Sequence, residues 1–152
     1  MRLRVALHFT VLIAFLFACT PTNAPPPAAD LSVTDAWVRT TAADGTSAAY
    51  MTITNGSGTL ERLIRASADA ADVTMLHETV IEGGIARMDH LTGIDIAPGQ
   101  SIALAPIGYH LMLIGLRHEL VVGEQVAITL EFDSGKTVTV DADVRPLVEG
   151  GS

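Results

Sequence analysis

Residues 73–91 read VTMLHETVIEGGIARMDHL and predict a β-hairpin. Two runs rich in β-forming residues flank Gly83-Gly84, and a two-residue Gly-Gly loop is typical of a tight β-hairpin. In a hairpin with that loop, His77 lies opposite His90, and Met88 is a diagonal neighbour of His77 on the same face. Because a slip of one residue moves a strand's side chains to the other face, the turn determines whether His77 and Met88 meet.

Similar short runs, separated by turn residues, continue along the chain. We expect further strands at residues 31–38, 47–55, 60–66, 101–104, 110–116, 126–132 and 137–144. Pro98-Gly99 and Ser134-Gly135 are among the turn signals between them. Many short strands at this spacing, with no long amphipathic helix and no internal repeat, predict an all-β antiparallel sandwich or small barrel.

The N-terminal region differs in composition from the rest of the chain. Residues 1–18 combine a basic start with an apolar run too short for a membrane span, which predicts a signal peptide. The run ends in Leu-Phe-Ala-Cys and resembles a bacterial lipoprotein cleavage site, with Cys19 as the lipidated residue; an ordinary secretory signal is the alternative. We expect a Pro/Ala-rich tether at 19–30, one domain at 31–148 and a flexible tail at 149–152.

Cysteine content and charge exclude several kinds of function. Cys19 is the only cysteine, so the domain has no disulfide, no thiolate nucleophile and no zinc-type cysteine pair. Removing residues 1–18 leaves 7 Lys+Arg and 17 Asp+Glu, a formal charge of −10. Such a surface disfavours nucleic acid as a partner. The sequence also lacks a phosphate-cradling glycine loop and a nucleophile–base pair, so we expect no enzyme activity.

A second pair of metal-ligating residues follows in the run from 110 to 116. His110 and Met112 are two residues apart on an expected strand, so both side chains project from one face. Bringing this strand to the hairpin would assemble two imidazole nitrogens and two thioether sulfurs from His77, Met88, His110 and Met112. Such a soft-to-borderline set suits Cu(I), whereas zinc and blue-copper sites recruit cysteine or carboxylate.

Each of these residues, taken alone, has an ordinary structural interpretation. Methionine in a β-protein most often fills the core, and we assign that role to Met51 and Met75. His118 is interpreted as a loop residue. His90 is either an exposed strand histidine or an auxiliary ligand, especially for Cu(II). The metal hypothesis depends on all four ligands meeting in one place.

The order and spacing of these four residues resemble the motif of the periplasmic copper-A chaperone family, the PCu(A)C-like proteins. The surrounding sequence resembles the family from about Asp35 to Val144, including the segments DAWVR (35–39), LHE (76–78) and GYHLMLIGL (108–116). Thr79 and Ile114 depart from it, because relatives often carry methionine there. The resemblance implies a cupredoxin-like Greek-key β-sandwich that binds one Cu(I) through His77, Met88, His110 and Met112.

The resemblance also implies a function. We expect an exported copper chaperone, lipid-anchored in the periplasm or cell envelope and monomeric, that delivers copper to the copper-A site of cytochrome c oxidase. Expected partners are the copper-A subunit, a Sco-type protein, or both. Protonation of the two histidine ligands should weaken binding below about pH 6.5. The alternatives are a copper-tolerance or scavenging protein, and a metal-free envelope β-sandwich that serves as an interaction domain.

Overall fold

The computed structural model describes residues 30–43 and 45–146, and in this part of the chain every regular element is a strand. No helix long and apolar enough to cross a membrane occurs among these residues. The expected signal peptide, Cys19, residues 19–29 of the tether and the tail lie outside the described residues. The strands are β1 (Leu31–Arg39), β2 (Thr46–Asn55), β3 (Glu61–Ala68), β4 (Ala71–Glu82), β5 (Ile85–His90), β6 (Ile94–Ile96), β7 (Ser101–Leu104), β8 (Tyr109–Leu116), β9 (Gln125–Phe132) and β10 (Thr137–Arg145).

The predicted all-β fold is confirmed, with one strand more than the sequence indicated. Every expected strand is present, and each end lies within two residues of the expected position. The additional strand is β6, which consists of Ile94, Asp95 and Ile96. Three residues are too few to show alternation, although the buried–exposed–buried pattern of β6 follows the period of a strand.

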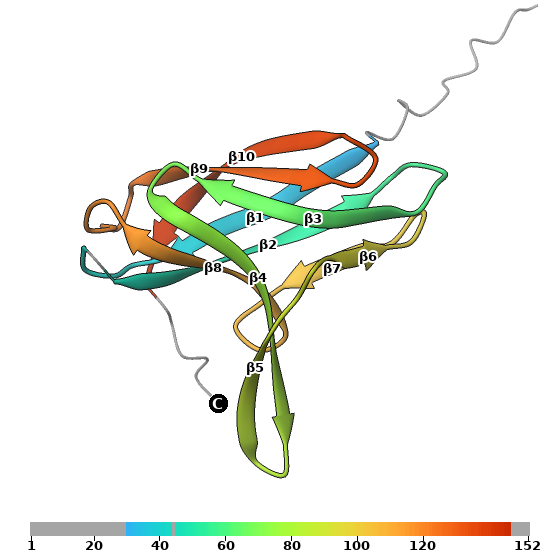
Figure 1. The fold of residues 1–152 in the computed structure, drawn as a ribbon. Coiled ribbons are helices and arrows are strands. Elements are labelled where there is room, and N and C mark those ends of the chain that lie inside the picture. The colour runs from blue at the N-terminus through green and yellow to red at the C-terminus, as the bar shows by residue number, and fades with distance from the viewer. Residues whose placement is uncertain (1–29, 44, 147–152) are drawn as a thin grey trace, which may run out of the picture.

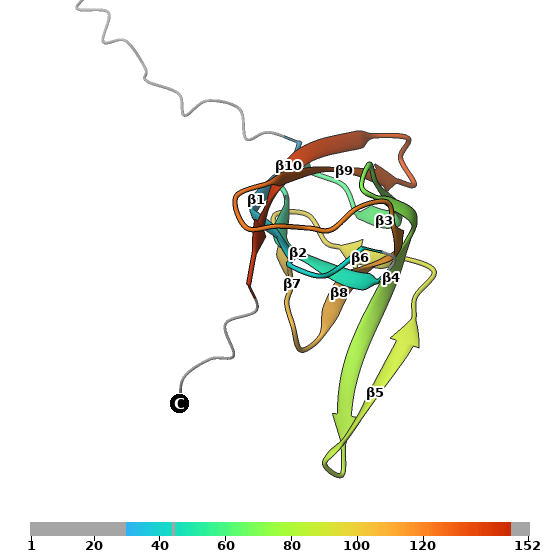
Figure 2. The same ribbon diagram turned by 90° about the vertical axis from the view of Figure 1, so that its left-hand side faces the viewer.

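The strands form one continuous sheet that curls around a core (Figures 1 and 2). Their order is β5-β4-β8-β2-β1-β10-β9-β3-β6, and β7 pairs with the far end of β2. All neighbours are antiparallel except β1 and β10, which run parallel and bring the first and last strands side by side. Strand β8, late in the chain, pairs with both β4 and β2, so it lies next to the predicted hairpin.

Alternating apolar side chains from the strands fill the interior. Leu111 and Leu113 of β8 face inward with Ile128 and Leu130 of β9, and all four are fully buried. Burying a side chain of this size contributes about 1.5–3 kcal/mol. Successive side chains of a strand point to opposite faces. Because Leu111 and Leu113 point inward, Met112 between them points outward.

A β-bulge in β1 sets the face on which its aromatic and basic residues lie. Thr34 pairs with Thr52 and Trp37 pairs with Tyr50, so β1 contains one residue more than β2 between these pairs. Asp35 lies in the bulge and has a φ of 53°, a left-handed conformation that a β-bulge accommodates. Beyond the bulge Val38 is fully buried, and Trp37 faces Tyr50 with ring centroids 4.5 Å apart.

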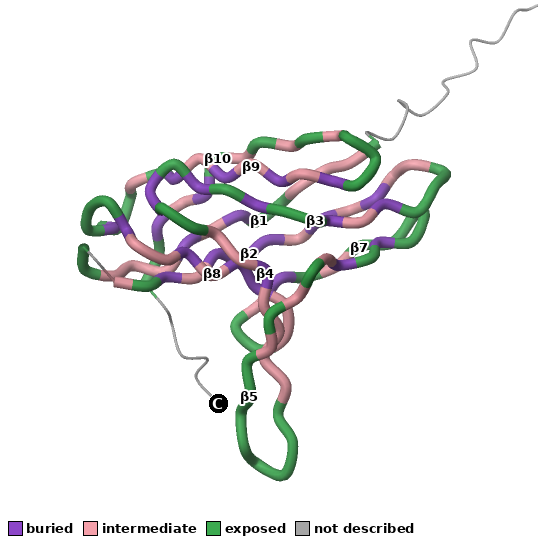
Figure 3. The backbone as a smooth tube through the Cα atoms, in the orientation of Figure 1, coloured by how far each residue is buried: buried purple, intermediate pink, exposed green. Residues whose placement is uncertain are grey.

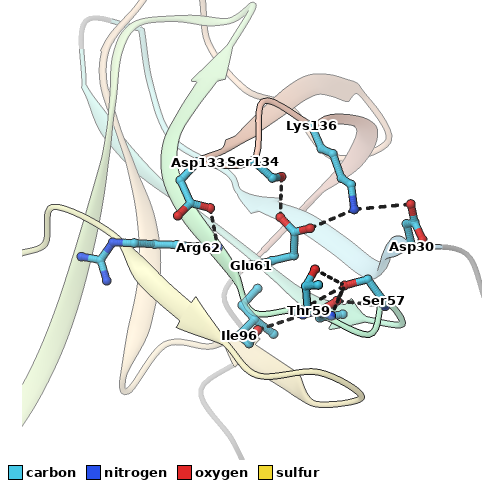
Figure 4. A network of polar contacts seen from close by, with 10 residues as sticks. Asp30, Ser57, Thr59, Glu61, Arg62, Ile96, Asp133, Ser134 and Lys136 are labelled. Carbon is cyan, nitrogen blue, oxygen red and sulfur yellow. Dashed lines mark hydrogen bonds and ion pairs between the residues drawn. The ribbon is translucent and has the colours of Figure 1, made fainter.

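A buried carboxylate, Glu61 at the start of β3, lies close to the β9–β10 turn and to residue 30 (Figure 4). Glu61 is 1% exposed and accepts hydrogen bonds from the Ser134 hydroxyl at 2.5 Å and the Lys136 ammonium at 2.8 Å. Lys136 also lies 3.4 Å from the carboxylate of Asp30. The hydrogen bond from Lys136, followed by that from Ser134, holds the pKa of Glu61 below its usual range. The network therefore ties the β9–β10 turn to the start of β1.

The hairpin of β4 and β5 projects from the body of the barrel as an arm (Figure 1), and its tip is exposed (Figure 3). Strand β5 is the edge of the sheet, so only β4 pairs with it. Ile81 and Ile85 near the tip are 54% and 73% exposed. The base of the arm adjoins β8, where the predicted metal ligands lie.

Candidate metal centre

The hairpin has the register that the sequence predicts. Gly83 and Gly84 have φ of 60° and 82°, as a two-residue turn with both central residues left-handed requires. Glycine adopts this conformation without a steric penalty from a Cβ atom. Strand β4 therefore pairs with β5 so that His77 faces His90 and Thr79 faces Met88. Met88 is a diagonal neighbour of His77, as expected.

Strand β8 completes the arrangement on the other side of β4. His77 pairs with His110, and Met75 pairs with Met112. Three histidines thus form a row across β5, β4 and β8. The ring of His77 lies 5.6 Å from that of His90 and 5.9 Å from that of His110, centroid to centroid, and both pairs are edge-to-face.

A hollow of about 250 Å³ opens beside this row. Its walls include Thr79, Met88, His110 and Met112, together with Arg39 and Tyr50. Three of the four predicted ligands therefore line one space, contributed by β4's two neighbours β5 and β8. His77 does not line the hollow itself, and its ring stands next to that of His110.

His110 is held in one orientation by the backbone of the preceding turn. Its side chain is buried, with 4% exposed, and its Nδ1 lies 3.1 Å from the carbonyl oxygen of Gly108. Since a carbonyl only accepts, Nδ1–H donates this bond and Nε2 keeps its lone pair. Metal-binding histidines are commonly oriented in this way by a second hydrogen bond.

His77 has the properties of a neutral imidazole without a protein partner. Its Nδ1 is buried and has no hydrogen-bond partner among the described residues. Burial lowers the pKa of His77, and the neighbouring His110 and His90 lower it further. A buried polar atom without a partner is unfavourable, and a metal ion bound by this ring would remove that penalty.

Met88 is the most exposed of the four candidate ligands. Met88 is 51% exposed on the edge strand, and Met112 is half-buried. A thioether binds Cu(I) without losing a proton, and an exposed thioether ligand is accessible to replacement by another ligand. The arrangement offers two imidazole nitrogens and two thioether sulfurs, of which the sulfur of Met88 is at the surface.

The remaining candidates have other positions. His90 is exposed and faces His77, which leaves its auxiliary role open. In the described part of the chain, no three side chains of histidine, cysteine, aspartate or glutamate lie close enough to hold a metal ion. The row of three histidines therefore does not converge on one point, and a site here depends on the methionines.

Met51 and Met75 were both predicted to fill the core, and the structure places only Met51 there. Met51 is 2% exposed in the core, as predicted. Met75 is half-buried on the outer face opposite Met112, so its assignment to the core is wrong. The residue shares its face with His77 because the two lie two positions apart on β4. His118 lies in an exposed loop, as expected, and pairs with Glu124 at 2.5 Å.

Sequence reasoning did not place Arg39 and Tyr50 at this site. Tyr50 pairs with Trp37 across β2 and β1, and Arg39 follows two residues later on the same face of β1. Only the bulge at Asp35 brings that face round to the hollow, and no periodicity in the sequence reveals a bulge. The only signal in the sequence for Arg39 is that the segment DAWVR, residues 35–39, resembles the PCu(A)C-like family.

The fold and donor set define the class of protein: an all-β, cupredoxin-like domain with a candidate nitrogen and sulfur metal site. The family model described as "Putative lipoprotein LpqE-like" matches residues 31–144. A curated relative, "Putative lipoprotein Lxx21020" of Leifsonia xyli subsp. xyli, is 35% identical over 150 residues, covering 91% of this chain and 89% of the relative. The chain belongs to the LpqE-like family, which is PCuAC-like.

Solved structures agree with this assignment. The Cu(I) form of DR1885 from Deinococcus radiodurans is 37% identical with a TM-score of 0.60, and the match covers 78% of this chain and 82% of that one. The copper-bound PCuAC domain from PmoF2 has a TM-score of 0.65 at 22% identity, over 78% of this chain and 94% of that domain. The second likeness confirms the cupredoxin-like fold alone.

Proposed function

We propose that this protein is a copper chaperone that binds Cu(I) through His77, Met88, His110 and Met112. The observation that carries the proposal is the meeting of β5, β4 and β8, which brings Met88, His110 and Met112 to the walls of one hollow and sets the ring of His77 beside that of His110. The Cu(I)-bound relative from Deinococcus radiodurans supports this ion, because its identity to this chain is 37%.

The donor set explains how a carrier could both hold and release copper. All four ligands are neutral, so Cu(I) binding requires no proton loss near neutral pH. No thiolate holds the ion, and an acceptor with thiolate ligands would bind Cu(I) more strongly. Met88 lies at the surface, where an acceptor's sulfur can replace it. These features favour transfer by ligand exchange rather than catalysis.

We further propose that the chaperone works in the cell envelope. Cys19 would carry the lipid anchor, residues 19–30 would hold the folded domain at 31–148 away from the membrane, and a monomer would suffice for the site. The descriptions of the family and of the Leifsonia relative as lipoproteins support this placement. The acceptor would be the copper-A subunit of cytochrome c oxidase, a Sco-type protein, or both, with copper ultimately reaching the copper-A site.

An anaerobic Cu(I) titration against a competing chelator tests the binding proposal. We expect one equivalent of Cu(I) per chain and a marked loss of affinity in His110→Ala. A domain that takes up no stoichiometric Cu(I) would be a metal-free interaction module. Oxidase activity in a deletion strain under copper limitation tests delivery: lowered activity that copper supplementation restores supports it, and unchanged activity favours a tolerance or scavenging role.

A further inference from the structure

Arg39 is set apart from the other basic residues that the structure describes. Six of them form ion pairs with aspartate or glutamate: Arg62, Arg65, Arg87, Arg117, Lys136 and Arg145. Arg39 forms none with any described residue, and it lines the hollow shared by Met88, His110 and Met112. In a chain with so many acidic residues, a half-buried cation without a carboxylate partner calls for a physical explanation.

The position of Arg39 in the sheet brings its charge to the candidate copper site. Ala48 of β2 pairs with Met112 of β8, while Ala49 pairs with Val38 of β1. One small side chain, Ala48, therefore separates Arg39 from Met112 along the sheet. The methyl group of alanine is too short to fill that space, and the hollow extends over it.

Tyr50 lines the same hollow as Arg39. Burial raises the pKa of the Tyr50 hydroxyl, and the charge of Arg39 offsets part of that rise. This electrostatic effect agrees with a half-buried positive charge at the wall of the hollow.

A cation in this place does not help to bind Cu(I), because the four proposed ligands are neutral and the loaded site carries a positive charge. The charge would instead attract an anionic group that enters the hollow, and a guanidinium offers several N–H donors to such a group. An incoming thiolate would be stabilised by both the copper and Arg39. A neutral ligand would gain nothing from Arg39.

We propose that Arg39 forms an anion-binding site for the thiolate of the molecule that takes copper from this protein. This inference rests on the proposed Cu(I)-binding function. The thiolate sulfur donates a lone pair to copper, a Cu–S bond forms, and the bond to the Met88 thioether breaks. Copper remains Cu(I) throughout, and a thiol that enters protonated releases its proton to solvent. Arg39 positions the incoming anion and does not itself bind copper.

The test compares Cu(I) transfer to two probes by stopped-flow. Glutathione supplies a thiolate, and neocuproine is an uncharged nitrogen chelator. The proteins are the wild type, Arg39→Gln, Arg39→Lys and the control Arg87→Gln, which removes an exposed arginine paired with Asp89 at 2.9 Å on the same hairpin. Circular dichroism and equilibrium Cu(I) affinity are measured for each protein first.

We expect Arg39→Gln to slow transfer to glutathione about five- to tenfold, the scale of a partly exposed charge interaction. Transfer to neocuproine should not be slowed beyond about twofold, and equilibrium Cu(I) affinity should not fall, because removing a positive charge beside the ion relieves repulsion. Arg39→Lys should recover most of the rate, and Arg87→Gln should match the wild type. Equal slowing with both probes would overturn the proposal in favour of a structural role, and no slowing with either would also overturn it. A wild-type protein that binds no Cu(I) would refute the proposed function instead.

Discussion

His110 pairs directly with His77 across β8 and β4, and their rings stand edge-to-face with centroids 5.9 Å apart. The hydrogen bond to Gly108 fixes the proton of His110 on Nδ1, while Nδ1 of His77 has no partner in the described structure. One imidazole is thus oriented before a metal arrives, and the other has an unsatisfied buried nitrogen. A fixed ring orientation favours metal binding by His110, and a bound metal ion would give the buried ring of His77 a partner.

Replacing either thioether by a hydrocarbon of similar size should discriminate between the two copper oxidation states. Met88→Leu and Met112→Leu should weaken Cu(I) binding at least about tenfold, because loss even of an outer-shell partner of a metal site has an effect of that size. Cu(II) binding should change less, since thioether sulfur is a soft ligand. Competition titrations with each ion measure both affinities. Met75→Leu is the matched control, and equal losses for both ions would refute the soft-ligand argument.

Acid should destabilise the apoprotein through His77 in a defined pH range. The pKa of His77 is lowered in the fold by burial and by His110 and His90, while in the unfolded chain it is about 6.5. As pH falls through that value, the unfolded chain takes up a proton before the folded protein does. The stability of the apoprotein therefore decreases from about pH 6.5 down to the lowered pKa of His77.

Urea unfolding of the metal-free protein at several pH values measures this effect. His77→Asn removes the titrating group, so the slope of stability against pH just below 6.5 should become shallower in this variant. Parallel curves for His77→Asn and wild type would show that His77 titrates alike in both states.

Replacing two glycines by alanine, one at a time, should distinguish the effect of backbone strain on stability from an effect on Cu(I) binding. Gly108 and Gly99 have φ of 106° and 71°, and a Cβ added at either meets no atom within 4 Å. Both substitutions should therefore destabilise the protein through backbone strain alone, by about 1–2 kcal/mol. Only Gly108→Ala should also weaken Cu(I) binding, because a backbone shift that relieves the strain at residue 108 would move the carbonyl oxygen that orients His110. Equal copper affinities in the two variants would contradict this role.

The buried carboxylate should matter for stability and not for copper. Glu61→Gln keeps the shape of the side chain but removes the negative charge of the carboxylate, which accepts hydrogen bonds from Lys136 and Ser134. We expect a loss of about 1–3 kcal/mol in the free energy of unfolding, the usual effect of weakening a buried charged hydrogen bond. Because its folded pKa is lowered, this contribution is present above the unfolded pKa and is lost as pH falls through the folded value. Denaturant unfolding measures it, and a change in Cu(I) affinity would contradict the separation of the two regions.

The hairpin could be predicted from sequence because its information is local. Gly83-Gly84 fixes the turn, the turn fixes the register, and the register places His77 near Met88. The alternation of Leu111 and Leu113 similarly fixes the outward direction of His110 and Met112, although His110 is itself nearly covered by its neighbours. Such elements can be predicted from two local features alone, the two-residue period of a strand and the residues that form a tight turn.

Other features depend on contacts between distant parts of the chain. The pairing of β8 with β4, rather than with another strand, follows from the topology of the whole sheet. The bulge at Asp35 reverses the alternation of β1 and brings Arg39 to the hollow, which no local pattern indicates. The exposure of Met75 likewise depends on the absence of a further layer over β4 and β8, among the described residues.

X-ray absorption of the Cu(I)-loaded protein identifies the ligands of copper directly, because it counts the atoms bound to the ion by element. The arrangement of His77, Met88, His110 and Met112 predicts two sulfur and two nitrogen scatterers, falling to one sulfur in Met88→Leu. A first shell made of nitrogen and oxygen without sulfur, unchanged in Met88→Leu, would contradict the proposed site.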